Sequence, residues 1–209
     1  MTNFGKLPLD QFLDALASNT PTPGGGTAAA VGGAMGASLA EMVAALTLSK
    51  EKYAASHDAV RPIAEAARVA RQEFVSLASE DSEAYESVVA ARRLPKDTEE
   101  QKAERAEKMA AANKHASEVP MRTARAAVRL LAALPDLAAK GNPNAISDAG
   151  AAALLLDACV EAALLNVGIN LPGIEDARFV AEMQRETADL QVESQRLRSQ
   201  VVALVRKSF

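Results

Sequence analysis

Asp81 occupies an unusual position for a carboxylate in this sequence. If residues around it form a helix, spacings of three and four residues place it on the same face as Phe74, Ala78, Tyr85 and Val88. The neighbouring glutamates fall on other faces. An acid on an apolar stripe must offset its desolvation, so it has either a structural hydrogen-bond partner or a chemical role. Spacing alone leaves both readings open.

A second set of polar groups lies just before a long apolar run. Asn142, Asn144, Ser147 and Asp148 supply two amides, a hydroxyl and a carboxylate. Amides both donate and accept, which suits a heterocycle with amide-like edges. Capping is the alternative, with Asn144 as N-cap and Asp148 favoured by the helix dipole. Capping explains one or two of these residues, but not all four.

Three consecutive glycines, Gly24, Gly25 and Gly26, precede another strongly apolar segment. Their backbone N–H groups can hold an anion or let a flat ligand approach closely. A tight turn that allows the glycines further along to pack against other helices is an equally good explanation. The turn is therefore a candidate binding element whose role the pattern does not decide.

Other familiar site types do not occur in the sequence. It contains no phosphate-binding loop, dinucleotide fingerprint, H-E-x-x-H motif or zinc-type cysteine cluster. His57 and His115 lack an acidic partner at Glu-x-x-His spacing, so we predict no metal. Cys159 lies in an apolar run and is expected to be a buried structural thiol.

The composition predicts one all-α domain over residues 1–209. Hydrophobic residues make up 49% of the chain, but aromatic residues only 3%, so Ala, Leu and Val must build the core. This favours closely packed helices over a sheet. The net charge of -4 and the lack of a basic stripe argue against nucleic acid and favour a small-molecule partner.

The N-terminus shows no secretory signal, so we expect a cytoplasmic protein. Residues 27–48 are the candidate membrane span, but Ala and Gly dominate them and they include Glu41. A buried helix is the better interpretation, and we predict no membrane contact.

The elements that must position these residues follow from periodicity and caps. Thr27 is the expected N-cap of the glycine-rich helix, and Thr98 and Gln101 form a capping box. Pro120 should kink or split the helix that follows. A seam from Val180 to Leu204 packs either within the bundle or against a second chain. Helices are expected from about residue 8 to 17, 27 to 49, 58 to 94, after 98, 145 to 167 and after 174.

Several segments together resemble the cyclodeaminase/cyclohydrolase family of folate enzymes. The resemblance covers nearly the whole chain, and the combination is specific although no single motif is. It rests on the run from Phe12 to Tyr53, on SEDSEAYESV around Asp81, on LPKDTEE, on GNPNAISDA and on NVGINL.

The resemblance implies an antiparallel helical bundle, usually a homodimer, acting on a tetrahydrofolate that carries a one-carbon unit. No cofactor beyond that substrate and no metal is implied. One family activity hydrolyses 5,10-methenyltetrahydrofolate to 10-formyltetrahydrofolate; the other cyclises 5-formiminotetrahydrofolate and releases ammonia, as a lyase. The chain has no room for a formiminotransferase domain, so we expect the cyclohydrolase. The alternatives are the cyclodeaminase and a non-catalytic folate-binding dimer.

By the same resemblance, Asp81 and Asp148 are the expected acidic pair, without assignment of acid and base. Asn142 and Asn144, with Ser147 beside them, would hold the pterin or position water. Gly24, Gly25 and Gly26 would shape the pocket, and Lys50 would meet the folate glutamate. Thr27 stands where Ser is common and Tyr85 where Phe is frequent, and both are mild departures.

Overall fold

The computed structural model describes residues 4–208, and within that range it contains helices and no strands. The prediction of an all-α fold is therefore confirmed. The long helices are α2 (Gly25–Leu48), α3 (Ala54–Arg92), α4 (Glu99–Leu131), α6 (Ile146–Asn170) and α7 (Ala177–Arg206). The short elements are α1 (Leu9–Leu16), α5 (Leu134–Lys140) and four 3-10 turns, η1 (Phe4–Lys6), η2 (Glu51–Tyr53), η3 (Pro143–Ala145) and η4 (Leu171–Gly173).

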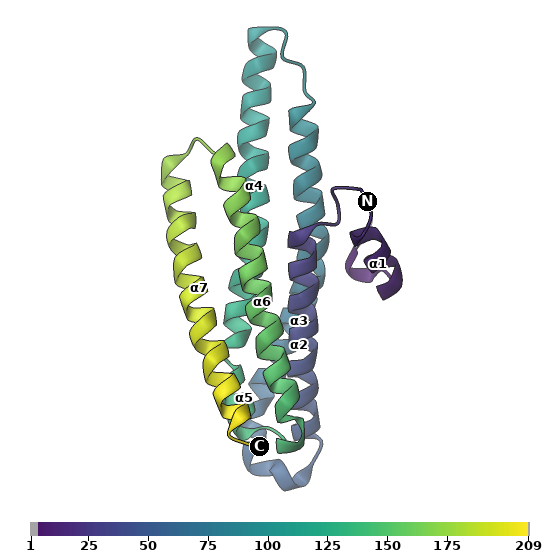
Figure 1. Ribbon diagram of the computed structural model, residues 1–209, viewed down its shortest axis with the longest axis vertical. Coiled ribbons are helices and arrows are strands. Elements are labelled where there is room, and N and C mark those ends of the chain that lie inside the picture. Colours follow the sequence, from purple (N-terminus) through teal and green to yellow (C-terminus); the bar gives the residue numbers. More distant parts are fainter. Residues whose placement is uncertain (1–3, 209) are drawn as a thin grey trace.

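The long helices run along one axis in an elongated bundle (Figure 1). Helix α6 lies in front of α4, with α7 on one side and α2 on the other. Helix α2 packs against α3 and α6, and α3 packs against α4. The ends of α3 and α4 project beyond the other helices as a hairpin, whereas α1 lies beside the bundle (Figure 1).

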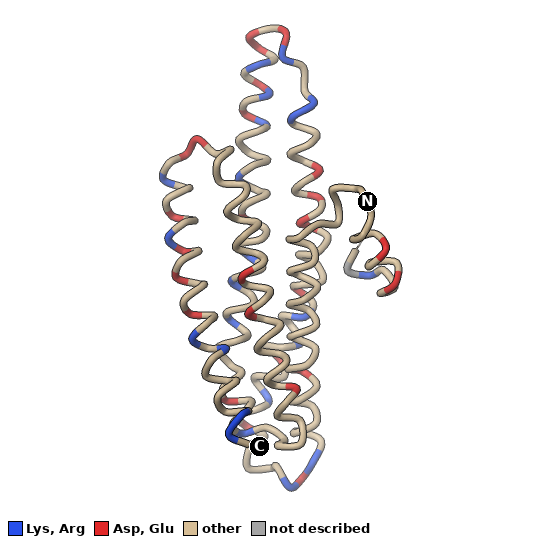
Figure 2. Tube along the Cα trace, in the orientation of Figure 1, with Lys and Arg blue, Asp and Glu red and all other residues tan. Residues whose placement is uncertain are grey.

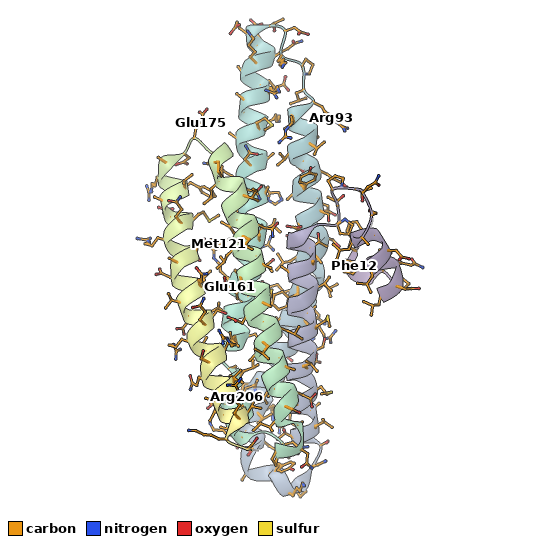
Figure 3. The ribbon with its side chains drawn as sticks, viewed as in Figure 1. Phe12, Arg93, Met121, Glu161, Glu175 and Arg206 are labelled. Carbon is orange, nitrogen blue, oxygen red and sulfur yellow. The ribbon has the colours of Figure 1, made fainter. Side chains whose placement is uncertain are left out.

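Small residues let the two most apolar helices, α2 and α6, approach their neighbours closely. A Cβ atom at Gly33 would lie 2.8 Å from the Phe74 ring and 2.9 Å from Cys159 Sγ. Burial raises the pKa of the Cys159 thiol to about 12, so this cysteine is an inert core residue, as predicted. Met121 fills the core from α4 and is fully buried (Figure 3).

Helix α7 uses its apolar seam within its own chain. Met183, Leu197 and Val201 are buried, and Val180 and Leu190 pack against the same core. The polar edge of this packing includes Glu161 of α6 (Figure 3), which accepts hydrogen bonds from two glutamines of α7. The seam is therefore part of the bundle, which was the first of its two predicted roles.

The start of α2 and the interior of α4 differ from expectation. Helix α2 begins at Gly25 with Gly24 as N-cap, because the hydroxyl of Thr27 bonds to another helix instead of capping its own. Helix α4 continues through Pro120, so of the two predicted effects, a kink or a split, the split is wrong. The capping box of Thr98 and Gln101 is confirmed, with both reciprocal bonds formed.

Two helical segments have the length and composition of a membrane span, Gly25–Leu48 and Pro143–Gly173. Both are helical segments of the bundle, and 44% of each apolar window is buried inside the protein. The sequence interpretation had identified only the first of them.

Candidate active site

A cavity of about 450 Å³ lies where the start of α2 meets α3, α4 and the end of α6. The turn before α2 forms one wall, and three helices supply the others. Its lining residues are Pro21, Thr22, Gly24, Gly25, Gly26, Asp81, Tyr85, Val88, Arg92, Met109, Asn113, Ala116, Asn166, Ile169, Asn170 and Gly173.

Asp81 is the carboxylate of this cavity. Thr27 Oγ1 donates a hydrogen bond to Asp81 Oδ2 at 2.9 Å, and the Thr27 backbone also bonds to the carboxylate. Thr27 is fully buried and lies 3.0 Å from the Ser82 hydroxyl, so a second side chain holds the donor in place. Desolvation by burial raises the pKa of Asp81, and the two bonds from Thr27 oppose that shift.

The glycine turn fits closely around this carboxylate. A Cβ atom at Gly26 would overlap the Asp81 carboxylate, so only glycine allows the acid to approach the first turn of α2. A Cβ atom at Gly25 would lie 3.3 Å from Asn166 Nδ2 of α6, so the turn and α6 meet at this point of the cavity. The three glycines therefore form a wall of the cavity, and Gly26 also determines where Asp81 lies.

Three asparagine side chains surround the cavity with their amide nitrogens already bonded. Asn113 Nδ2 donates to the Gly173 carbonyl at 2.9 Å, and Asn166 Nδ2 donates to the Ala162 carbonyl at 2.8 Å. Asn170 Nδ2 donates to the carbonyls of Ala116 and Asn166. Asn170 thus uses both of its N–H groups, so the three side-chain oxygens and one N–H each of Asn113 and Asn166 are the groups that remain for a ligand. The cavity is therefore rich in hydrogen-bond acceptors.

Sequence reasoning missed these three asparagines and Arg92 as site residues. Asn166 and Asn170 lie in the NVGINL segment, and their spacing of four places them on one helical face. Arg92 follows Asp81 by eleven residues, which is three turns along the same face of α3. The spacing was available in the sequence, but the assignment to one cavity required the packing of α3, α4 and α6.

The other predicted polar cluster lies at the opposite end of α6 and serves the backbone there. The buried Asn142 side chain accepts from the Tyr53 hydroxyl at 2.9 Å and from the Asn144 N–H at 3.1 Å. The backbone N–H of Asn142 donates to Thr47 Oγ1 at 2.8 Å. Ala145, and not Asn144, is the N-cap of α6. Asn144 and Ser147 are exposed, and Asp148 is half-buried.

A single chain therefore does not bring the predicted acidic pair together. Asp148 precedes Asn166 by eighteen residues, about 27 Å along α6 at 1.5 Å per residue. Lys50 follows the far end of α2 and is likewise remote from Asp81. We expected one pocket to hold all these residues, and within one chain this is wrong. The length of α6 separates the Asp81 cavity from Asp148 and the residues near it.

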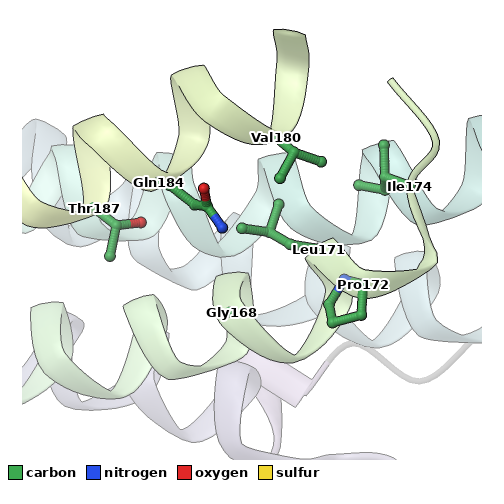
Figure 4. A pocket seen from close by; sticks show the side chains of 7 residues that line it. All are labelled: Gly168, Leu171, Pro172, Ile174, Val180, Gln184 and Thr187. Atoms are coloured by element: carbon green, nitrogen blue, oxygen red, sulfur yellow. The ribbon is translucent and has the colours of Figure 1, made fainter. Parts of the chain in front are cut away.

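A second hollow, of about 400 Å³, lies between the end of α6, η4 and α7 (Figure 4). Its lining is mostly apolar, with Leu171, Val180 and Ile174 among its side chains. Gln184 and Thr187 are the polar side chains in it, and neither can exchange a proton near neutral pH. This hollow therefore lacks the groups for acid–base chemistry that the Asp81 cavity has.

Within residues 4–208, no group of three or more His, Cys, Asp or Glu side chains is arranged to hold a metal ion. The expectation that the protein needs no metal or added cofactor stays a prediction. The groups in the cavity are one carboxylate with a raised pKa, amide oxygens and a cationic side chain. That set can bind a planar polar ligand and move a proton beside it.

Comparison with known proteins shows which family the chain resembles. Residues 8–189 match the formiminotransferase-cyclodeaminase family. The chain belongs to that family. The family resemblance seen in the sequence is thereby confirmed.

Individual relatives cover almost the whole chain. It is 39% identical to a methenyltetrahydrofolate cyclohydrolase of Methylorubrum extorquens over 97% of both proteins. It is 33% identical to the chicken formimidoyltransferase-cyclodeaminase, of which it covers 37%. A solved structure, the formiminotetrahydrofolate cyclodeaminase of Thermotoga maritima, superimposes with a TM-score of 0.86 at 34% identity, over 97% of both chains.

Proposed function

We propose that this protein is a methenyltetrahydrofolate cyclohydrolase, which hydrolyses 5,10-methenyltetrahydrofolate to 10-formyltetrahydrofolate. The observation that carries the proposal is the placement of Asp81 in an acceptor-lined cavity, on a chain 39% identical to a cyclohydrolase over nearly its whole length. The substrate is a cation, and its reduced pterin ring bears several N–H donors. A carboxylate and three amide oxygens complement both properties.

Asp81 is the group that handles protons in this proposal. In the ionised state it takes a proton from the water that attacks the methenyl carbon, and the bridge becomes a neutral carbinolamine. The carboxyl group then assists transfer of the carbinolamine hydroxyl proton to N5 while the bond between N5 and the carbon breaks. The formyl group stays on N10, and one proton is released overall.

Thr27 and Gly26 hold Asp81 for that task. The hydroxyl of Thr27 fixes one carboxylate oxygen, and the absent side chain at Gly26 leaves room for the other. Positioning of this kind lowers the entropy cost of bringing the base to the reacting water. Asn113, Asn166 and Asn170 would accept the pterin N–H groups, and Arg92 would meet a carboxylate of the glutamate tail.

The cyclodeaminase is the second candidate, because the Thermotoga structure with a TM-score of 0.86 bears that name. Its reaction passes through a similar tetrahedral carbon, so the same carboxylate would serve.

The non-catalytic dimer through the α7 seam loses its basis, because Met183, Leu197 and Val201 are buried within one chain. We also propose that the functional unit is a homodimer. The cytoplasmic location stays a prediction from the sequence.

The test is direct. Purified protein should accelerate the loss of the near-ultraviolet absorbance of 5,10-methenyltetrahydrofolate, and Asp81→Asn should remove the acceleration. Ammonia release from 5-formiminotetrahydrofolate without hydrolysis of the methenyl compound would instead assign the cyclodeaminase. Decay at the uncatalysed rate together with no ammonia release would overturn both.

A separate kinetic measurement tests the proposed role of Arg92 in binding the glutamate tail. Arg92→Gln should raise KM for the folate at least several-fold and leave kcat nearly unchanged, because the tail lies away from the reacting carbon. Lys50→Gln is the matched control for the contact predicted from sequence. In a single chain its side chain lies at the wrong end of α2 for this contact.

A further inference from the structure

Two hydroxyl groups and a carboxylate are joined in a row where the start of α2 packs against α3. Thr27 Oγ1 lies 2.9 Å from Asp81 Oδ2 and 3.0 Å from Ser82 Oγ. Thr27 is fully buried and Ser82 is 3% exposed, so bulk water does not compete for either hydroxyl. We call Ser82, Thr27 and Asp81 the hydrogen-bond chain. It connects two adjacent residues of α3 through one residue of α2.

The direction of the two hydrogen bonds follows from the number of protons in the chain. A threonine hydroxyl has one proton to donate, and an ionised carboxylate has none. While Asp81 is ionised, the Thr27 proton therefore points to Asp81 Oδ2. The Thr27 oxygen is then the acceptor in its second contact, so Ser82 is the donor there. The chain runs in one direction, from Ser82 through Thr27 to Asp81.

The helix that carries Ser82 places it for this contact. Consecutive residues of an α-helix lie about 100° apart around its axis, so neighbours face different surroundings. Asp81 lines the cavity, whereas Ser82 is buried where α3 contacts Thr27 of α2. The missing side chain at Gly26 lets the first turn of α2 approach α3 closely enough for Thr27 to reach both residues.

Few charges act on Asp81, so its hydrogen bonds matter more. The first charged residue of α2 is Glu41, about four turns beyond Thr27, and the start of α2 is uncharged (Figure 2). Among the described residues that line the cavity, Arg92 and the phenol of Tyr85 are the other titratable groups, both from α3. The lining residues from α4 and α6 do not titrate. Burial raises the pKa of Asp81, and the bonds from Thr27 lower it.

We propose that Ser82 is a positioning residue, which orders the Thr27 hydroxyl so that Asp81 Oδ2 stays occupied and Asp81 Oδ1 is the oxygen that takes the proton from water. The inference rests on the proposed function. Oδ1 lies against Gly26, where the absent side chain leaves it open to the cavity. A lone pair of the water oxygen forms the bond to the methenyl carbon, and the π electrons of the carbon–nitrogen bond move to nitrogen. The water proton moves to Oδ1.

Loss of the Ser82 hydroxyl would remove this order. The Thr27 oxygen would have no donor, and its hydroxyl could turn to a carbonyl of the preceding turn, as threonine hydroxyls do near helix starts. Asp81 Oδ2 would then lose a hydrogen bond that favours the ionised acid. Either oxygen could take a proton, and the acid would be protonated at a higher pH than in the wild type.

The first test needs no substrate. Carbon-13 NMR of the side-chain carboxyl group, assigned by its absence in Asp81→Asn, follows the protonation of Asp81 as pH changes. Ser82→Ala should move this titration to higher pH, but less far than Thr27→Val does, because Thr27 keeps its hydroxyl. Ser87→Ala is the matched control, since exposed Ser87 bonds to the Glu83 carbonyl of its own helix, and it should leave the titration unchanged.

The second test asks whether Ser82 acts through Thr27. Ser82→Ala should move the acid limb of the kcat profile to higher pH and leave KM for 5,10-methenyltetrahydrofolate nearly unchanged. The loss of turnover at neutral pH should be smaller than that of Thr27→Val. In a Thr27→Val background the chain is already broken, so adding Ser82→Ala should move neither the titration nor the profile further.

Several results would overturn the inference. These are an unchanged Asp81 titration in Ser82→Ala, or a further shift when Ser82→Ala is added to Thr27→Val. If Ser82→Ala does not fold, Ser82→Cys replaces it, because a thiol is a similar-sized but weaker donor and should shift the titration in the same direction. A shifted titration in a protein that hydrolyses the methenyl compound no faster than water, and releases no ammonia, would support the hydrogen-bond chain and overturn the proposed function.

Discussion

The two ends of α6 use similar side chains in opposite ways. At the cavity end, Asn166 and Asn170 donate their amide nitrogens to main-chain carbonyls and keep their oxygens for other contacts. At the start of the helix, the Asn142 oxygen already accepts two hydrogen bonds, from Tyr53 and Asn144. The first arrangement leaves acceptors for a ligand, whereas the second completes the fold of a loop.

The carboxylates show the same contrast. Burial raises the pKa of Asp81, so its environment works against the ionised state that the reaction needs. Half-buried Asp148 lies in the first turn of α6, where the helix dipole favours a negative charge. A carboxylate in an environment that disfavours its ionised form is a sign of a functional site. We therefore expect substitutions at the cavity end to reduce turnover and substitutions of Asn142 to reduce stability.

The largest expected effect is that of Asp81→Asn. Turnover should fall about a hundredfold or more, because the amide cannot accept the proton from water. Stability should hold or rise at neutral pH. The raised pKa of Asp81 means that the fold loses stability as pH increases from 3.8, the ordinary aspartate value, through the raised pKa. The amide variant does not ionise and escapes this loss.

Absorbance kinetics and thermal unfolding at several pH values measure both effects. Glu80→Gln is the matched control, since Glu80 is the preceding residue and bonds instead to Arg122 and Ser76. It should leave turnover unchanged. A loss of folding in Asp81→Asn would show that the acid is structural and would remove the contrast between the two ends.

Asn142→Ala tests the opposite end. Removing a buried acceptor leaves the Tyr53 hydroxyl and the Asn144 N–H without their partner, which should lower the free energy of unfolding by about 1–3 kcal/mol. Urea denaturation measures the change. Tyr53→Phe removes one of the two donors and should cost less. Unchanged stability in Asn142→Ala would contradict the structural role given to this loop.

Gly26→Ala sharpens the comparison at the cavity end. The new methyl group would overlap the Asp81 carboxylate, so the acid must move and turnover should fall about tenfold. In an Asp81→Asn background the same change should have little further effect on turnover, because the two residues act through one group. Additive losses in the double variant would show that Gly26 acts separately, for instance on substrate entry.

Thr27→Val should give the smallest effect. Loss of the hydroxyl removes a hydrogen bond that lowers the pKa of Asp81, so the pKa should rise further. Activity depends on the ionised acid and falls as pH decreases through this pKa. The acid limb of the rate profile should therefore move to higher pH, with a loss of only a few-fold at neutral pH. Thr27→Ser restores the donor and should restore the profile.

Much of the fold could be predicted from local patterns. The capping box at Thr98, the short amphipathic α1 and the apolar character of α2 and α6 are properties of neighbouring residues, and the structure contains each of them. The split predicted at Pro120 does not occur, because packing in the bundle holds α4 together through a residue that disfavours a helix. Thr27 misled the prediction because its hydroxyl bonds to α3 instead of its own helix.

By itself the sequence determined the helical class and the burial of Cys159, and it placed Asp81 on an apolar stripe without deciding between a structural and a chemical role. All three follow from periodicity and composition along one element. Only the tertiary structure decided which polar groups share a cavity. It joined Asp81 to Gly26 and Asn166, which lie far apart in the chain, and it separated Asp148 from them by the length of α6. Helices are rigid rods, so the way they pack, and not their order, determines which ends meet.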